Sequence, residues 1–421
     1  MTQDQPILEW EGKEATVPPA LELIQTAVVL ASSATDVIDE RLIQGENLGV
    51  MSALQADYAG KIDLIYADPP FLSGKTYRVR TGQGEDSRRP EDWKTAKGFR
   101  DEWNDRAEYL NMLYSRLNLM HGLLAETGTL YLHLDWHSAG YARVILDEIF
   151  GPGRLLNEII WTYHGPSPIL SAFKRKHDTI LVYTKSKDYT FNADAVRVPY
   201  DASTVKTFAS TKAGFGKRPD LDRGKVPEDW WYFPVVARMH SERTGYPTQK
   251  PEALLERIVL ASSNPGDLVA DFFVGSGTAV AIARRLNRRW IACDISPIAI
   301  NTTRRRLLLE PEAGSFGVWA DKTIQDQNVL HPKIAVKAKN LDVEAQLTDL
   351  NPEALMAFEL DWNYDGELFR SEAQAVRGWR QEQFDTRLDH SYPEAGSYVV
   401  AARAVDAEGQ TGLVTERVQV G

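Results

Sequence analysis

The sequence predicts an α/β protein with a mostly parallel sheet, an insertion in the middle of the chain and a small all-β domain at its end. Short apolar runs alternate with helical patterns in residues 36–164 and again in residues 246–310, which is typical of parallel strands joined by helices. Residues 165–245 break this alternation with a polar, glycine-containing stretch. Residues 353–421 contain alternating apolar runs around Glu408-Gly409, which is a hairpin signal.

The first half follows an N-terminal extension, residues 1–35, in which the Ala-rich segment Ala20–Ser33 predicts one helix. Residues 72–100 are polar and have no apolar period, so we expect a loop that closes over a substrate or, alternatively, a surface insertion. The expected strands are Arg41–Gln44, Ile62–Ala67 and Thr129–Leu134, and the expected helices run from Asn47 through Leu54, over Tyr109–Glu126 and over Ala139–Phe150.

The insertion contains two short strand candidates, Thr179–Thr184 and Asp188–Asn192. Residues 311–352 are rich in Gln, Asp and Ala and predict a linker to the β domain. Between them we expect a helix over Pro251–Ser262, a strand over Leu268–Phe272, a helix over Thr278–Leu286, a strand over Trp290–Asp294 and a helix over Pro297–Leu309.

Composition excludes several classes of protein. No apolar segment approaches the roughly 20 residues needed to span a bilayer, and the N-terminus is acidic rather than basic and then apolar, so we expect a cytoplasmic protein without a membrane partner. The only cysteine, Cys293, excludes an internal disulfide and a cysteine-based zinc site, and the eight histidines lack metal-ligand spacing. No metal is therefore expected.

The net charge of −11 argues against a nucleic-acid partner, but the charge is unevenly distributed. Residues 310–421 hold 20 acidic and 10 basic residues, whereas residues 165–245 hold 14 basic and 9 acidic residues. The middle region is thus suited to phosphate contact, with the aromatic run Trp230–Phe233 either beside it or in the core. The candidate DNA-binding residues are Lys174, Arg175, Lys176, Lys212, Lys217 and Arg218.

The segment Leu64–Phe71 (LIYADPPF) reads as a buried strand that delivers one carboxylate to the rim of the sheet. Pro69 and Pro70 fix φ and remove two backbone donors, so the turn offers carbonyl acceptors beside the Asp68 carboxylate. Phe71 adds a flat apolar face. A planar amino group with two N–H bonds fits these four candidate catalytic residues, whereas the alternative is a plain Pro-rich turn.

A second motif, Asp271–Thr278 (DFFVGSGT), lies between a predicted strand and a predicted helix. Gly275 and Gly277 allow a ligand to approach the backbone closely, and the carboxyl edge of the sheet is where α/β folds bind ligands. Asp294 closes the next strand at the spacing where an acid accepts ribose hydroxyls, although it also suits a helix N-cap. A third glycine and a phosphate-binding lysine motif are missing, which favours an adenosine without phosphates over a dinucleotide.

With both motifs in view, the chain resembles the β class of amino-group-specific DNA methyltransferases, which includes modification subunits of restriction systems. The resemblance extends from about Leu42 to Leu309 and follows the order of that class. The matching segments are LIQGENLGVMSAL, DLIYADPPF, GRLLNEIIW, ERTGYPTQKPEALLERIVLASSNPGD and LVADFFVGSGTAVAIARRLNRRWIACDIS. The sequence departs from the family at Glu46 (more often Asp), at Phe71 (usually Tyr in adenine enzymes) and at Asp271-Phe272 (usually Asp-Pro).

The resemblance implies a Rossmann-like S-adenosylmethionine-dependent methyltransferase fold, with a seven-stranded sheet, circularly permuted so that a catalytic half (36–164) precedes a cofactor half (246–310). Residues 165–245 then form the target-recognition region, and residues 353–421 look like an immunoglobulin-like or PKD-like module. The implied partners are double-stranded DNA, a cognate restriction enzyme and a second copy of the chain. The residues implied to bind the cofactor S-adenosylmethionine are Asp271, Phe273, Gly275, Gly277, Thr278, Asp294, Thr248, Lys250 and Asn47.

The implied reaction is methyl transfer to the exocyclic amine of a flipped base, which Asp68 and the Pro69 carbonyl orient and Phe71 stacks. Adenine N6 is the leading target and cytosine N4 the alternative, because Asp68 begins the motif where cytosine enzymes favour Ser. Cytosine C5 methylation needs a thiolate nucleophile, and Cys293 is predicted to be a small core residue that points away from the site. A non-catalytic DNA-binding or scaffold protein on the same fold remains the second alternative.

Overall fold

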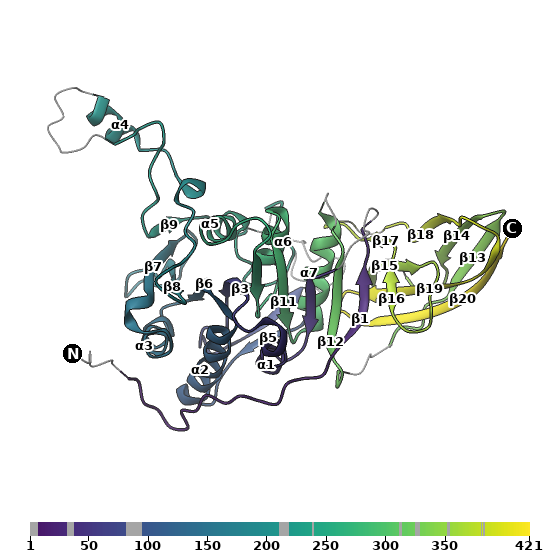
Figure 1. Cartoon of the computed structure of the whole chain (residues 1–421), viewed down its shortest axis with the longest axis horizontal. Helices are drawn as coiled ribbons and strands as arrows, with labels where there is room; N and C mark the ends of the chain where they lie inside the picture. Colours follow the sequence, from purple (N-terminus) through teal and green to yellow (C-terminus); the bar gives the residue numbers. More distant parts are fainter. Residues whose placement is uncertain are drawn as a thin grey trace.

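The computed structural model describes residues 7–31, 38–80, 95–209, 219–237, 240–310, 314–324, 329–351, 354–379, 381 and 384–421. Their main feature is an 11-stranded sheet that runs across the molecule, with two smaller antiparallel sheets from the C-terminal residues at one end (Figure 1). At the other end, helix α4 (Ala202–Ala209) projects away from the sheet (Figure 1). No helix among the described residues is long and apolar enough to cross a membrane.

Seven strands form the centre of the large sheet, in the order β2-β11-β10-β3-β6-β8-β7. All neighbours from β2 to β6 are parallel, whereas β8 runs antiparallel to both β6 and β7. The carboxyl ends of the parallel strands therefore meet at one edge. The bounds are β2 Arg41–Gln44, β11 Arg289–Asp294, β10 Leu268–Asp271, β3 Ile62–Ala67, β6 Leu124–Leu134, β8 His177–Thr184 and β7 Leu155–Thr162.

Helices cover both faces of this sheet and make a three-layer core. The helices α1 (Asn47–Tyr58), α2 (Arg106–Leu123) and α3 (Ala139–Phe150) pack their apolar residues on one face. The helices α5 (Glu252–Ser262), α6 (Thr278–Arg285) and α7 (Pro297–Leu309) pack on the other. Strand residues alternate between the two clusters, as a sheet covered on both faces requires. The fold is thus the expected mostly parallel α/β architecture.

Side-chain caps explain where three of these helices begin. Glu46 accepts the backbone N–H of Gly49 at the start of α1, and Asp105 accepts that of Glu108 at the start of α2. Ser296 accepts the N–H of Ala299 ahead of α7, where Pro297 has no N–H to satisfy. Because such caps are local in sequence, the predicted start of α7 agrees with the structure.

The sheet is wider than the seven strands that the resemblance implied. Strands β12 (Phe316–Asp321), β1 (Leu23–Val29) and β16 (Phe369–Ser371) extend one side, and β9 (Trp230–Tyr232) extends the other. The helix predicted over Ala20–Ser33 is therefore wrong, because its apolar residues pair as a strand with β12 and β16. Tertiary pairing outweighed the weak helical propensity of that segment.

Three further sequence predictions differ from the structure. The expected loop over residues 72–100 contains the antiparallel strands β4 (Lys75–Arg80) and β5 (Thr95–Asp101), and its residues 81–94 lie outside the described chain. The strand expected over Asp188–Asn192 is absent from those residues. In residues 165–245, the strands β8 and β9 belong to the large sheet, so this region is not wholly an insertion.

The linker predicted over residues 311–352 is also wrong, since β12 lies there in the large sheet and two strands of the C-terminal sheets follow it. The hairpin predicted around Glu408-Gly409 is present as the turn between the last two strands. The three-stranded sheet consists of β13 (Ile334–Lys339), β14 (Asp342–Leu347) and β18 (Arg387–Ser391), and the four-stranded sheet of β17 (Ala373–Val376), β15 (Leu355–Asp361), β19 (Gly396–Asp406) and β20 (Thr411–Val420).

Candidate active site

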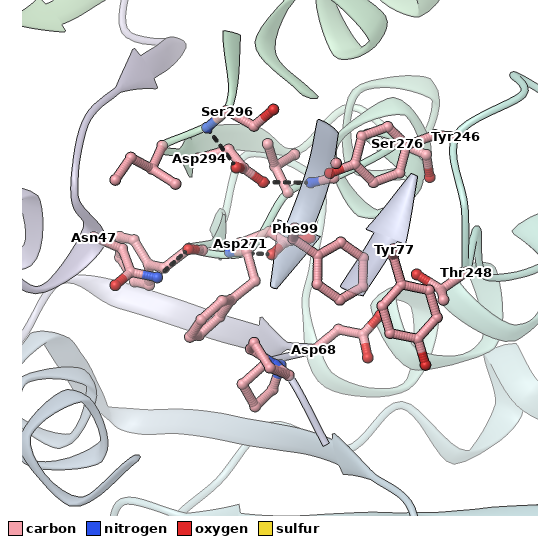
Figure 2. A pocket seen from close by; sticks show the side chains of 18 of the residues that line it. Asn47, Asp68, Tyr77, Phe99, Tyr246, Thr248, Asp271, Ser276, Asp294 and Ser296 are labelled. Carbon is pink, nitrogen blue, oxygen red and sulfur yellow. Dashed lines mark hydrogen bonds between the residues drawn. The ribbon is translucent and has the colours of Figure 1, made fainter. Parts of the chain in front are cut away.

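A pocket with a volume of about 400 Å³ opens at the carboxyl edge of the central strands. Its walls come from the ends of β3, β10 and β11, from the β4–β5 hairpin and from the segment that precedes α5 (Figure 2). Asp68 and Asp294, which are far apart in the sequence, line the same pocket. The two motifs found in the sequence therefore share one cavity, as expected for the carboxyl edge of a parallel sheet.

Asp68 is held at the end of β3 by an ion pair inside the pocket. Its Oδ2 lies 2.5 Å from the Nζ atom of Lys250, and the two side chains are only 19% and 8% exposed. The same ammonium lies 5.2 Å from the centre of the Phe71 ring. A group with several N–H donors thus occupies the space above the ring and beside the carboxylate.

The turn that follows Asp68 is fixed by Asp101, the last residue of β5. The buried Asp101 carboxylate accepts the backbone N–H groups of Phe71, Leu72 and Ser73 at 2.8–3.1 Å, and the indole N–H of Trp103 at 3.0 Å. Leu72 has a φ of +67°, a value that side chains other than glycine rarely adopt. The carboxylate compensates this strained backbone by satisfying three consecutive donors.

The neighbouring Pro70 carbonyl is also engaged, because it accepts the Tyr109 hydroxyl at 2.9 Å. No described side chain donates to the Pro69 carbonyl. Of the two prolines, Pro69 therefore has the carbonyl that a ligand can reach.

A buried polar network supports Phe71 from below. The ring of His133 stacks on Phe71 with centroids 5.9 Å apart and planes at 22°. His133 is fully buried, with Nδ1 2.8 Å from the Tyr66 hydroxyl and Nε2 3.2 Å from Asp178 Oδ2. Burial raises the pKa of Asp178, but the hydrogen bonds and charge of His133 outweigh this and lower it overall. The network joins β3, β6 and β8 behind the pocket.

The glycine loop lies beside Asp294. The Asp294 carboxylate accepts the N–H of Gly275 at 3.0 Å and that of Ser296 at 2.9 Å (Figure 2). Gly275 has a φ of +48°, and a Cβ atom there would lie 3.2 Å from the ring of Tyr246. Burial raises the pKa of Asp294. Asp294 thus closes the loop and also faces the pocket.

Asp271 ends β10 behind the loop and accepts the N–H of Phe273 at 2.9 Å. Burial raises the pKa of Asp271 to about 8, and the nearby carboxylates of Asp68 and Asp294 contribute in the same direction. Asp271 is therefore a partly protonated group near neutral pH rather than a fixed anion.

The other predicted cofactor residues differ in their positions. Asn47 lines the pocket, with its amide donating to the Phe272 carbonyl at 2.9 Å. Thr248 lines it with a φ of +58°, and Thr278 lines it with its hydroxyl bonded to the Lys250 carbonyl. Gly277 does not line the pocket, and a Cβ atom there would lie 2.8 Å from the side chain of Thr303. Packing against α7 accounts for that glycine.

Of the predicted DNA-binding residues, Lys174, Arg175 and Lys176 lie on the connection between β7 and β8, and all are exposed or half-buried. Lys212, Lys217 and Arg218 lie outside the described residues. In β9 the predicted aromatic run alternates, with Trp231 buried in the core and Trp230 exposed by 62%. The run therefore belongs to both of the alternatives considered for it. Cys293 is fully buried, as predicted.

Sequence reasoning missed the aromatic wall of the pocket. Tyr77 of β4 and Phe99 of β5 stack with centroids 4.6 Å apart, and both line the cavity (Figure 2). Tyr246 faces the glycine loop from the opposite side. The only sequence signal for the pair was aromatic residues within an otherwise polar segment directly after Asp68.

This arrangement suits the binding of two flat groups and the orientation of an amine. An apolar cavity walled by Phe71, Tyr77 and Phe99 accepts planar rings, while Asp68 and the Pro69 carbonyl offer acceptors at one side. The described residues contain no cluster of His, Cys, Asp and Glu that could hold a metal ion.

Comparison with known proteins gives the following similarities. The sequence pattern of the DNA methylase family, of N6/N4 type, matches residues 62–305. The type II methyltransferase M.HpaI of Haemophilus parainfluenzae is 33% identical over 272 residues, which cover 64% of this chain and 74% of that protein. The DNA adenine methyltransferase YhdJ of Escherichia coli K12 is 29% identical over 270 residues, which cover 63% and 82%. A crystal structure of a DNA modification methylase of Thermus thermophilus with S-adenosyl-L-methionine is 19% identical, with a TM-score of 0.41 and coverage of 67% and 97%.

Proposed function

The chain belongs to the N6/N4 DNA methylase family, and from this premise we propose that it transfers a methyl group from S-adenosylmethionine to adenine N6 in double-stranded DNA. DNA amino-group methylation is the activity of the family. The choice of adenine, the residue roles and the partners below are our proposal.

The residues of the pocket fit S-adenosylmethionine. The cofactor supplies a methyl group activated by a sulfonium, so the protein needs only to bind and orient it. Asp294 at the end of β11 is placed to accept ribose hydroxyls, and the backbone of Phe273 and Gly275 borders the same space. The aromatic and proline residues in the walls provide apolar surface for the adenine ring. Asn47, Thr248 and Thr278 complete this part of the lining.

The contact between Lys250 and Asp68 is the observation that carries the proposal. A positively charged N–H donor lies 2.5 Å from the carboxylate and over the Phe71 ring. A target amine stacked on Phe71 requires the same environment, with one N–H bonded to Asp68 and the other to the Pro69 carbonyl. Lys250 therefore holds the acceptor in place until the substrate amine replaces it.

Asp68 then favours the reaction by orientation and electrostatics. An exocyclic amine is a weak nucleophile because its lone pair is delocalised into the ring, and two N–H acceptors favour a more tetrahedral nitrogen. As the new N–C bond forms, the nitrogen gains positive charge beside the Asp68 carboxylate. The nitrogen then loses one proton, for which Asp68 is the acceptor within reach.

Analysis of the product tests the target base. We expect the purified protein, incubated with S-adenosylmethionine and unmethylated bacterial genomic DNA, to give N6-methyladenine after digestion to nucleosides and mass spectrometry. N4-methylcytosine would instead assign the alternative base to the same residues. Neither product, with cofactor binding shown by calorimetry, would contradict the enzymatic assignment and favour the scaffold alternative.

Substitution of Asp68 tests the residue role. Asp68→Ala should lower methyl transfer by at least about 100-fold, because it removes the acceptor that orients the amine. Asp68→Asn keeps the size of the side chain and should be similarly inactive, whereas the exposed Asp57→Ala on α1 serves as a control. Cofactor affinity should change little in all three variants. Normal turnover by Asp68→Asn would refute the role of the carboxylate.

The partners beyond DNA follow from the family resemblance alone. A cognate restriction enzyme and a second copy of the chain stay predictions for co-purification and sedimentation experiments. Target recognition by residues 165–245 is likewise proposed, on the basis of their excess of basic residues.

A further inference from the structure

The connection between β7 and β8, residues 163–176, carries two apolar side chains with almost no contacts. Leu170 is 96% exposed and Phe173 is 99% exposed. The next most exposed large apolar side chain in the described chain is Val17, at 66%. A fully exposed phenylalanine is costly to keep in water, and two such residues three positions apart indicate a surface that is covered when the protein works.

The connection rises from the edge of the sheet that holds the active site. Ala67, one residue before Asp68, pairs with Leu132 of β6, and Leu134 of β6 pairs with Thr179 near the start of β8. With strands about 4.8 Å apart, β8 lies roughly 10 Å and β7 roughly 15 Å across the sheet from β3. The two exposed side chains thus lie on the rim, within one or two base pairs of the pocket.

The base of the connection is fixed, whereas its tip is free. The backbone N–H of Tyr163 donates to the Lys176 carbonyl at 3.1 Å, and the Lys176 ammonium donates to the Pro166 carbonyl at 2.9 Å. The Arg175 guanidinium lies 4.1 Å from the centre of the Trp136 ring, just beyond β6. These contacts hold Leu170 and Phe173 on a supported hairpin loop.

The charges beside the apolar tip indicate what covers it. Lys174, Arg175 and Lys176 follow Phe173 directly, so the tip presents apolar side chains flanked by cations. A protein partner with a dry apolar interface would have to bury these charges, whereas duplex DNA offers phosphates to the cations and base steps to the apolar side chains. The partner chemistry that fits both features is the DNA duplex.

We propose that Leu170 and Phe173 form a wedge that enters the duplex beside the target base and occupies the space this base leaves when it enters the pocket. The inference rests on the proposed function, because a base whose amine reaches Asp68 must leave its stack. The wedge replaces part of the lost stacking, while Lys174 and Arg175 hold the adjacent backbone. Its role is in opening the duplex and not in methyl transfer itself.

The test compares methylation of two forms of the same DNA site, once sequencing of methylated genomic DNA has defined that site. In one duplex the target base is paired, and in the other it lies opposite an abasic position. The variants are Leu170→Ala, Phe173→Ala and the double substitution. Val329→Ala, at another exposed apolar residue (50%) near the C-terminal sheets, is the control.

We expect the double variant to lose at least about tenfold in kcat/KM on the paired duplex and to come within about threefold of the unsubstituted protein on the abasic duplex. Cofactor affinity and the melting temperature should not change, since neither side chain is packed. The control should behave as the unsubstituted protein on both substrates.

Three results would overturn the wedge. Full activity of the double variant on paired DNA would show that the side chains are not needed, and an equal loss on both substrates would assign them to general binding. A change from dimer to monomer without a substrate-dependent effect would assign the tip to a protein interface. Absence of methylation by the unsubstituted protein would instead remove the proposed function, and the wedge with it.

Discussion

At the scale of single residues, Asp101 has the clearest effect on the catalytic turn without touching the reacting atoms. It is 1% exposed and binds three consecutive backbone N–H groups after Pro70, as well as the indole of Trp103. These donors have no alternative acceptor in the pocket wall. Asp101 therefore acts as a positioning residue for Phe71.

We predict that Asp101→Ala lowers both stability and kcat. Leaving a buried donor unsatisfied costs about 1–3 kcal/mol, and Leu72 would keep its strained φ without compensation. The free energy of unfolding, measured with urea, should fall by at least about 2 kcal/mol, and kcat by about tenfold or more because Phe71 and Asp68 lose their fixed orientation.

The neighbouring exposed Glu102 gives a matched control, and Glu102→Ala should leave both quantities unchanged. Asp101→Asn keeps one acceptor oxygen and should lie between the two variants. An Asp101→Ala protein with unaltered kcat would contradict the positioning role.

At the same scale, the sequence could predict residues whose signal is local. Asp68, Gly275 and Asp294 each follow an apolar strand, and the edge of a parallel sheet brings such positions together. Tyr77 and Phe99 could not be predicted in the same way, because they meet only through the pairing of β4 with β5 across residues 81–94. Cross-strand contacts depend on register, which a polar segment without an apolar period does not reveal.

At the scale of elements, α7 links the pocket to the C-terminal sheets. It begins directly after Asp294 and Ser296, which line the pocket. On its other side, Arg304 forms an ion pair with Glu359 of β15, which Arg403 of β19 also contacts at 2.8 Å. Glu359 is fully buried, and burial raises its pKa and lowers that of Arg304.

We predict that Glu359→Gln destabilises the protein strongly. Removing the carboxylate leaves two guanidinium groups without their buried counter-charge, which costs about 3–5 kcal/mol for a broken buried pair. Thermal unfolding should begin at a clearly lower temperature than in the unsubstituted protein. Because α7 borders the pocket, saturating S-adenosylmethionine should recover part of this loss.

The exposed Glu367→Gln provides the control of equal chemistry and should unfold as the unsubstituted protein does. If Glu359→Gln retained the original unfolding temperature, the C-terminal sheets would contribute little through this ion pair.

At the scale of the whole molecule, the chain is more continuous than its sequence indicated. A change of composition after Pro311 predicted a linker and a separate domain, since such shifts often mark boundaries. In the structure, β12 and β16 instead extend the large sheet, and β16 pairs with β1 from the N-terminal segment. Composition reports local character, whereas strand order is decided by long-range pairing that a single sequence does not show.

This continuity predicts the result of truncation. A protein that ends at residue 324 keeps β12 but loses β16, so β1 is exposed as an edge strand. It also loses the carbonyls of Arg377 and Gly378, which accept from the guanidinium of Arg305 at 2.7 and 2.9 Å. Arg305 is 2% exposed in the full chain, so truncation leaves its surroundings without these partners.

We therefore expect the truncated protein to aggregate or to unfold well below the full chain, with loss of methyl transfer, when gel filtration and thermal unfolding are compared for the two. A dispensable C-terminal module joined by a linker gives the opposite result, a monodisperse protein with full activity. The Glu359→Gln variant separates the two causes within the full chain: it keeps the β1–β16 pairing and removes only the charge that α7 requires. A truncated protein much less stable than that variant would assign most of the difference to the exposed edge of the sheet.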